Sequence, residues 1–170
     1  IEARLETLGI EHFRCGGTGV VGVLRHGQGP VIGFRADTDG LPIAEQTGLD
    51  YASTATGTLP DGSQAPVMHG CGHDTHITAA LAAAHYLVEH TDTWQGTVVF
   101  VFQPGEETAQ GAQAMVEDGL ADAIPRPDVA LGQHVLAAPA AGEVATAAGP
   151  VLSTAASVRV TVHGKGSHGS

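Results

Sequence analysis

Positive charge and long apolar runs are both scarce in this chain. Seven Lys and Arg residues stand against 18 Asp and Glu in 170 residues, which gives a net charge of −11. Nucleic acids and anionic membranes bind basic patches that replace their counterions, so the composition argues against both partners. No apolar stretch approaches the roughly 18 residues that a membrane-spanning helix needs. We therefore expect neither nucleic-acid nor membrane binding, and we interpret the acidity as a contribution to solubility.

Cysteine is equally scarce, with one thiol at Cys15 and one at Cys71. The two could form a disulfide, but Cys71 lies within a cluster of potential metal ligands. A thiolate ligand requires a reducing compartment or protection by the metal. These considerations predict a cytoplasmic protein.

The two ends of the sequence indicate a longer protein. A chain of 170 residues normally forms one domain that needs no disulfide. However, the sequence begins at Ile1, inside a short amphipathic helix pattern, and it ends soon after an alternating strand pattern over 157–163. Such a strand needs partner strands. We interpret the sequence as a segment of a larger chain.

Between these ends, strand patterns alternate with helix patterns. Two apolar runs joined by a flexible turn indicate a hairpin, and 44–67 indicates a long polar loop. The order strand, helix, strand, helix, strand is typical of a parallel sheet with crossover helices. We predict an α/β fold with a mostly parallel sheet flanked by helices. The expected elements are the hairpin strands 20–24 and 31–34, a helix over 75–90, a strand over 97–102, a helix over 108–119 and a strand over 128–135.

The densest group of potential metal ligands lies at 68–76, where one thiol, three imidazoles and a carboxylate share nine residues. A lone Cys or His is usually structural, but clustering favours a metal, because divalent transition metals select these residue types. In an extended segment, Cys71 and His73 leave the same face. In a helix, His73 and His76 lie on the same face. Either geometry brings two donors together.

Acids and a further histidine follow three of the predicted strands. The carboxyl ends of parallel strands share one edge of a sheet, so we expect these residues to converge there. Such a set could hold one tetrahedral metal or a pair of neighbouring ions. In the alternative interpretation, the first two acids only form a turn ahead of Pro42. The residues are Asp37 and Asp39, then Glu106 and Glu107, and finally His134.

The adjacent acids Glu106 and Glu107 predict two different roles. Neighbouring side chains on a turn point in different directions, so one can bind a metal while the other reaches the water that the metal activates. A metal lowers the pKa of bound water from near 16 toward roughly 7, and a carboxylate can then take its proton and pass it to a leaving amine. This chemistry suits the hydrolysis of an amide.

Five segments together resemble the M20 metallopeptidases, in particular the aminoacylase/hippurate hydrolase branch of the N-acyl-amino-acid amidohydrolases. The resemblance implies a zinc-peptidase-like catalytic domain over 1–152. From 153 to 170 it implies the beginning of an α+β lid domain through which the protein forms a homodimer. The segments occur in the order 34–43, 68–76, 102–107, 132–135 and 164–169.

The same resemblance assigns roles to individual residues. Glu106 would be the general base, and Asp39 would support a neighbouring group of the metal site. His168, in the lid, would polarise the scissile carbonyl. The implied ligands of a two-metal centre are Cys71, His73, Glu107 and His134.

The resemblance also implies the metals and the substrate. Thiolate favours zinc and carboxylates accept manganese, with cobalt as a further candidate. The substrate would be an N-acyl amino acid carrying an acetyl, benzoyl or similar group. Relatives supply one more ligating His from a segment beyond residue 170, so we expect these 170 residues alone to bind metal weakly and to turn over little.

Two other functions stay open from the residues alone. A cysteine hydrolase with Cys71 as nucleophile would be inactivated by thiol alkylation and indifferent to chelators. A non-catalytic, metal-stabilised binding module would require loss of the general base, whereas Glu106 is present.

Overall fold

The computed structural model describes residues 1–59, 61–154, 156 and 158–166. Contacts divide the chain into two units, Ile1–Val135 and Leu136–Ser170. The helices and strands all lie in the first unit, and the described residues of the second unit form neither. Within the described chain, no helix has the length and apolar character needed to cross a membrane. The domain boundary predicted between residues 152 and 153 stays a prediction.

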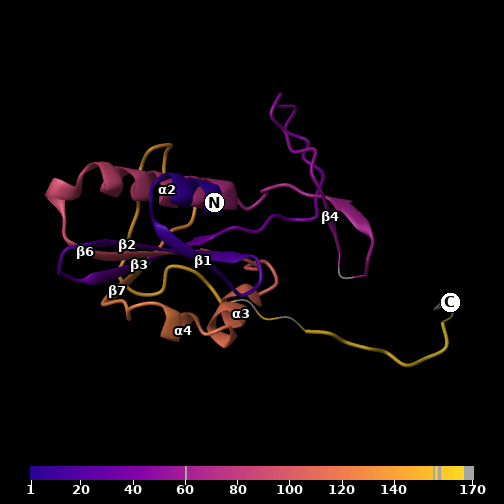
Figure 1. Cartoon of the computed structure of the whole chain (residues 1–170). Coiled ribbons are helices and arrows are strands. Elements are labelled where there is room, and N and C mark those ends of the chain that lie inside the picture. The colour runs from indigo at the N-terminus through magenta and orange to yellow at the C-terminus, as the bar shows by residue number, and fades with distance from the viewer. Residues whose placement is uncertain (60, 155, 157, 167–170) are drawn as a thin grey trace. The chain divides into compact units, whose positions relative to one another are not determined.

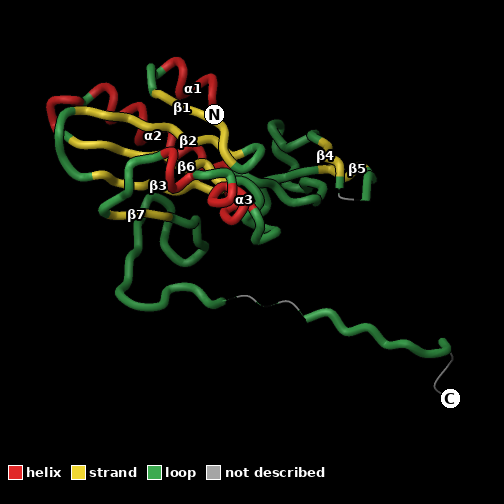
Figure 2. The backbone as a smooth tube through the Cα atoms, turned by 60° about the horizontal axis from the view of Figure 1, so that its bottom comes forward, coloured by secondary structure: helices red, strands yellow, loops and turns green. Residues whose placement is uncertain are grey.

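The first unit combines a five-stranded sheet, a separate two-stranded sheet and several helices (Figures 1 and 2). In chain order the elements are α1 (Glu2–Thr7), β1 (Glu11–Cys15), β2 (Gly19–His26), β3 (Val31–Asp37), β4 (Thr56–Thr58), β5 (Gln64–Pro66), α2 (His73–Glu89), the 3-10 helix η1 (Thr91–Thr93), β6 (Gly96–Gln103), α3 (Gly111–Glu117), α4 (Leu120–Ala123) and β7 (Val129–Gly132).

Three neighbouring strands of the larger sheet run parallel. The strand order is β1-β2-β6-β3-β7, in which β3 is parallel to β6 and β7, and β2 is antiparallel to β1 and β6. The sheet is therefore mixed, where the sequence predicted a mostly parallel one. The chain leaves β3, β6 and β7 at the same edge, so the predicted convergence of the residues that follow these strands is met.

The predicted hairpin of 20–24 and 31–34 is wrong. Both runs form strands, but β6 lies between them and pairs with each. The apolar run of β6 has buried residues on both faces of the sheet, so an interior position removes more apolar area from water than an edge position would. The turn between β2 and β3 spans this inserted strand, and the carbonyl of Pro30 accepts a hydrogen bond from the Thr97 N–H at 3.0 Å.

The helices and the last strand occur as predicted, with shifted ends. Helix α2 begins at His73, so the helical alternative for His73 and His76 is confirmed. Helix α3 begins at Gly111, because the preceding residues form a turn in which Ala109 adopts a φ of 56°. Strand β7 ends at Gly132, which leaves His134 beyond the sheet.

The alternating pattern near the end of the chain does not form a strand in residues 158–163, and residue 157 lies outside the described residues. Val158, Val160 and Val162 are 86%, 78% and 86% exposed. An isolated strand leaves its backbone groups unpaired, so alternation alone does not produce one where the described chain offers no partner. Conversely, the sequence patterns failed to indicate β1, β4 and β5, which are short and largely polar.

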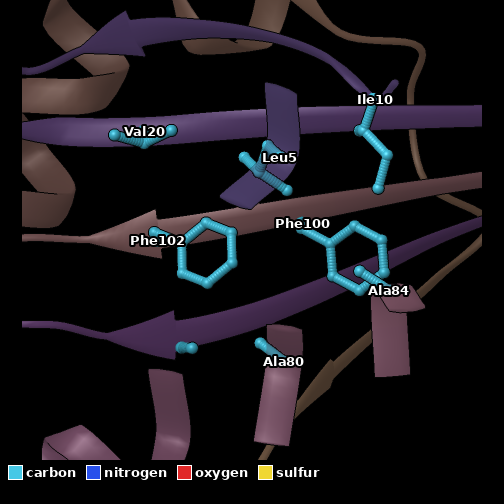
Figure 3. Close-up of a cluster of buried hydrophobic side chains, with 8 residues drawn as sticks. Leu5, Ile10, Val20, Ala80, Ala84, Phe100 and Phe102 are labelled. Atoms are coloured by element: carbon cyan, nitrogen blue, oxygen red, sulfur yellow. The ribbon is translucent and has the colours of Figure 1, made fainter. Parts of the chain in front are cut away.

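Side chains that alternate along the central strands form a hydrophobic cluster on each face of the sheet. Figure 1 shows α1 and α2 on one side of the sheet and α3 and α4 on the other, so the first unit has helices on both faces. The cluster beneath α1 and α2 consists of Leu5, Ile10, Val20, Ala36, Ala80, Ala84, Phe100 and Phe102 (Figure 3), and the cluster beneath α3 consists of Cys15, Val21, Val23, Val99 and Met115.

Replacing Phe100 by Ala should lower the free energy of unfolding by roughly 3–5 kcal/mol, because the phenyl ring is 1% exposed and its removal leaves a cavity in the cluster. Urea unfolding of the full-length protein measures the change. Val116→Ala on α3 is the control, since Val116 is 61% exposed and should shift stability by less than about 0.5 kcal/mol. Equal effects of the two substitutions would contradict the assigned core.

Candidate metal centre

Four connections bring potential metal ligands to the edge of the sheet where β3, β6 and β7 end. Asp37 and Asp39 come from the end of β3, and Glu106 and Glu107 from the turn after β6. Cys71 and His73 come from the start of α2, and His134 from the segment after β7. Three groups have donor atoms within 4.8 Å of one another: Cys71, His73 and His134; His73, Glu106 and Glu107; and Asp37, His73 and His76.

His73 is the residue common to all three groups, and its side chain is fully buried. Its Nδ1 lies 3.0 Å from the carbonyl oxygen of Asp39 and 3.2 Å from Oδ1 of the same residue. Because both of these oxygens are acceptors, we assign the proton to Nδ1. The other nitrogen, Nε2, is then left with its lone pair directed into the cluster.

This buried Nε2 has no hydrogen-bond partner among the described residues. Instead it faces carboxylate oxygens of Asp37 at 3.7 Å and of Glu106 and Glu107 at 3.9 Å each. An unpaired buried polar atom is costly, whereas ligands that share one divalent ion are held roughly 3–4 Å apart. The unpaired nitrogen and the surrounding acidic donors therefore fit a divalent metal.

Asp39 connects two of the elements that carry these donors. Its Oδ1 and carbonyl oxygen accept the Nδ1–H of His73, and its Oδ2 accepts the backbone N–H of Glu107 at 2.9 Å. The carboxylate thus fixes the ring of His73 relative to the turn after β6. Asp39 therefore lies at the site, in contact with His73 and the Glu107 backbone, and its role as a supporting acid stays a prediction.

His134 lies against Cys71, which precedes α2. Its Nε2 is 3.8 Å from the Cys71 Sγ, and its Nδ1 donates to the carbonyl oxygen of Val135 at 2.7 Å. One ring nitrogen of His134 is therefore occupied by the backbone, and the other faces the thiol of a second potential ligand. Both cysteines are free, so the disulfide considered between Cys15 and Cys71 does not form.

The sequence placed Asp37 among the acids expected at this edge and His76 in the ligand-rich segment, without a specific role for either, and both are about 1% exposed at this site. The Nδ1 of His76 donates to Oδ1 of Asp37, and its Nε2 accepts the backbone N–H of Val135 at 2.9 Å. The spacing of three residues from His73 on a helix was the available signal for His76. Its backbone partner is not visible in the sequence.

The pKa of Asp37 lies below its ordinary value. Burial by itself raises that pKa, but the hydrogen bond from His76, the Arg35 guanidinium 3.0 Å from Oδ2 and the neighbouring imidazoles of His73 and His76 lower it by more. Asp37 therefore stays ionised and available as a hydrogen-bond acceptor.

The Cys71 thiol shows the opposite shift. Its partial burial, and then the hydrogen bond and charge of Glu107 and the charge of Glu106, raise its pKa. Without metal, the carboxylates around the thiol therefore disfavour the thiolate, and a cation that binds there must displace the thiol proton.

Alkylation of Cys71 should report this raised pKa. In metal-free, full-length protein carrying Cys15→Ala, the alkylation rate should rise at a higher pH than for an ordinary cysteine. Glu107→Gln should move the profile to lower pH, because it removes a negative charge that opposes the thiolate. The measurement is the rate of iodoacetamide reaction against pH. The assignment would be contradicted if, in the Cys15→Ala protein, the alkylation rate rose at the same pH as for a free thiol or at a lower pH.

Gly72 allows the His134 segment to approach the start of α2. Gly72 has a φ of +78°, and a Cβ at this position would lie 2.4 Å from Cγ1 of Val135. Gly72→Ala should therefore displace Val135 and lower zinc affinity by about tenfold or more, in the range typical of lost support behind a metal ligand. Zinc titration with a competing chelator measures the loss in the full-length protein. Gly70→Ala is the control, because its Cβ would meet only side-chain atoms, the nearest at 3.3 Å; equal affinities of the two variants would overturn this account.

The predicted residue His168 lies outside the described residues. The remaining predicted residues, which are Asp39, Cys71, His73, Glu106, Glu107 and His134, all lie at this one site. Thiol, imidazole and carboxylate donors at one edge of a sheet covered by helices define a metal-binding α/β domain.

The chain belongs to peptidase family M20/M25/M40, whose family model matches residues 33–168. The resemblance to M20 metallopeptidases is thereby confirmed. Solved structures agree: a dinuclear metal-binding peptidase of the M20 family from Bacillus subtilis superposes with a TM-score of 0.65 at 36% identity, over 78% of this chain and 34% of that chain.

Three proteins that are similar to this chain are hydrolytic enzymes by name. Thermostable carboxypeptidase 1 of Saccharolobus solfataricus is 37% identical over 98% of this chain and 40% of its own length. N-acetyl-L-cysteine deacetylase of Bacillus subtilis is 41% identical over 83% of this chain and 31% of its own length. IAA-amino acid hydrolase ILR1-like 4 of Arabidopsis thaliana is 37% identical over 99% of this chain and 36% of its own length. The chain thus spans between about a third and two fifths of these relatives.

Proposed function

We propose that the full-length protein is a metal-dependent amidohydrolase that cleaves the amide bond of N-acyl amino acids. The observation that carries the proposal is the buried Nε2 of His73, which has no hydrogen-bond partner in the described part of the chain. It faces three carboxylates at 3.7–3.9 Å and lies in one group with Cys71 and His134. Relatives named as a deacetylase and an amino acid hydrolase support an amide substrate.

The metal ligands in this proposal are Cys71, His73, Glu107 and His134. The relative described as dinuclear supports a pair of ions, and the mixture of thiolate, imidazole and carboxylate suits zinc or manganese, with cobalt as a further candidate. Bound metal would polarise the substrate carbonyl and make water a stronger nucleophile at neutral pH.

Glu106 is the general base in this proposal, and Glu107 is a ligand. The backbone of Glu107 is held by Asp39, and its side chain is 26% exposed, whereas the side chain of Glu106 is 41% exposed and its Oε2 lies 3.9 Å from Nε2 of His73. The more accessible carboxylate is the one that can meet a water and a substrate. Glu106 would take a proton from the attacking water and return it to the leaving amine, which completes the cleavage.

The partners implied by the resemblance complete the proposal. The substrate carries an acetyl, benzoyl or similar acyl group, and the protein is a cytoplasmic homodimer that associates through a lid domain beginning near residue 153. His168 of that lid would polarise the scissile carbonyl.

Hydrolysis of N-acetyl- and N-benzoyl-amino acids by the full-length protein tests the proposed function. Activity should vanish with a chelator and return with zinc or manganese. Glu106→Gln should lower kcat by about 10²–10⁴ while the protein keeps its metal, because the variant lacks only the proton acceptor. Glu89→Gln, an exposed carboxylate on α2, is the matched control and should leave kcat unchanged.

The remaining outcomes separate the alternatives. Activity that survives chelation and disappears on thiol alkylation would establish a cysteine hydrolase with Cys71 as nucleophile. Metal binding without turnover of any acyl amino acid would point to a metal-stabilised binding module.

A further inference from the structure

We propose that His76, which is not among the predicted ligands, positions His134 for metal binding through the backbone of Val135. The inference rests on the proposed function only in taking His134 as a metal ligand. It comes from an unbroken series of hydrogen bonds, within the first unit, that runs from Asp37 through His76 and Val135 to the His134 ring.

Both nitrogens of His76 are occupied by the protein. The backbone N–H of Val135 can only donate, so Nε2 of His76, 2.9 Å away, must be the acceptor. The proton then lies on Nδ1, which donates to Oδ1 of Asp37. No lone pair of His76 is left for a metal, although its donor atoms lie within 4.8 Å of those of Asp37 and His73. His76 therefore supports the site and does not bind the ion.

Val135 connects His76 to His134 by two hydrogen bonds. Its N–H is held by His76, and its carbonyl oxygen accepts the Nδ1–H of His134 at 2.7 Å. That bond fixes the tautomer of His134 and directs Nε2 toward the Cys71 Sγ, 3.8 Å away. Ligating histidines commonly donate their second N–H to a backbone carbonyl, and such supporting contacts set ring orientation.

The restraint is needed because the sheet does not hold His134. Strand β7 ends at Gly132, and within the described chain no backbone hydrogen bond anchors residues 133–136. His134 is exposed, and Val135 is 48% exposed. His76, in contrast, is 1% exposed on the long helix α2, and its ring lies 4.7 Å from that of His134 at an angle of 69°. The buried face of α2 thus positions a ligand that lies beyond the end of its own strand.

Two substitutions separate the two hydrogen bonds of His76. His76→Asn retains a donor near the Nδ1 position, which can still reach Asp37, but it has no acceptor for the Val135 N–H. His76→Gln places its amide oxygen near the Nε2 position and can accept that N–H. Each variant keeps one buried hydrogen bond and loses the other, so both should lose a similar amount of global stability.

Two measurements on the full-length protein test the role of His76. In the metal-free protein, amide hydrogen exchange at Val135 should be fast in His76→Asn and remain slow in His76→Gln. In a Co²⁺ titration followed by visible absorption, His76→Asn should lose roughly 10- to 100-fold in affinity. His76→Gln should stay near wild type, with unchanged band positions. Val21→Ala, in the cluster on the other face of the sheet, is the control for lost stability and should leave Co²⁺ affinity unchanged.

The inference is overturned if His76→Asn binds Co²⁺ as tightly as wild type, or if both His76 variants lose affinity to the same extent. It is also overturned if His76→Gln alters the Co²⁺ bands, because His76 would then itself be a ligand. Failure of the proposed function looks different: Co²⁺ would bind and respond to His76→Asn as expected, while the wild-type protein hydrolysed no acyl amino acid.

Discussion

Two buried imidazoles in the first turn of α2 hold together the chain segments that form the site. His73 is bonded to Asp39, and His76 is bonded to Asp37, so each ring is locked in one tautomer by the end of β3. Buried polar groups must find partners, and this demand fixes α2 against the sheet edge more sharply than apolar packing alone could. The other ring nitrogens differ: that of His73 has no hydrogen-bond partner among the residues that the structure describes, and that of His76 accepts the Val135 N–H.

The electrostatics of the site follow from the same arrangement. Carboxylates that follow β3 and β6 surround one buried ring nitrogen. Partial burial, and then the charges of Glu107 and Glu106, raise the pKa of the neighbouring Cys71 thiol. Like charges gathered in a partly dry region are unfavourable unless a cation joins them. A divalent ion would relieve this repulsion, bind the lone pair of His73 Nε2 and stabilise the Cys71 thiolate. Thiol, imidazole and carboxylate donors therefore suit one shared cation.

Several of the candidate site residues lie in loops and turns between the strands and helices. Glu106 and Glu107 lie on a turn and His134 beyond the end of β7, so neither segment is held by the sheet ladder. Side chains from α2 and from the segment after β3 bind these backbones: Asp39 accepts the Glu107 N–H, and His76 accepts the Val135 N–H. A rigid sheet edge with pinned loops is a common way to combine precise donors with an accessible site.

The sequence by itself determined the helix α2, the strand β6 and the residue types of the candidate site, because helical spacing, apolar runs and clusters of metal-binding side chains are local features. It also predicted the shared edge, since that follows from parallel strands alone. Only the tertiary structure decided that β6 separates β2 from β3, that 158–163 forms no strand, and that His76 bonds Asp37 on one side and the Val135 N–H on the other. Strand order depends on which placement buries the most apolar area, and the role of His76 depends on a backbone N–H that lies 59 residues away in the sequence. A local sequence pattern encodes neither the strand order nor the role of His76, because both arise from contacts between distant segments.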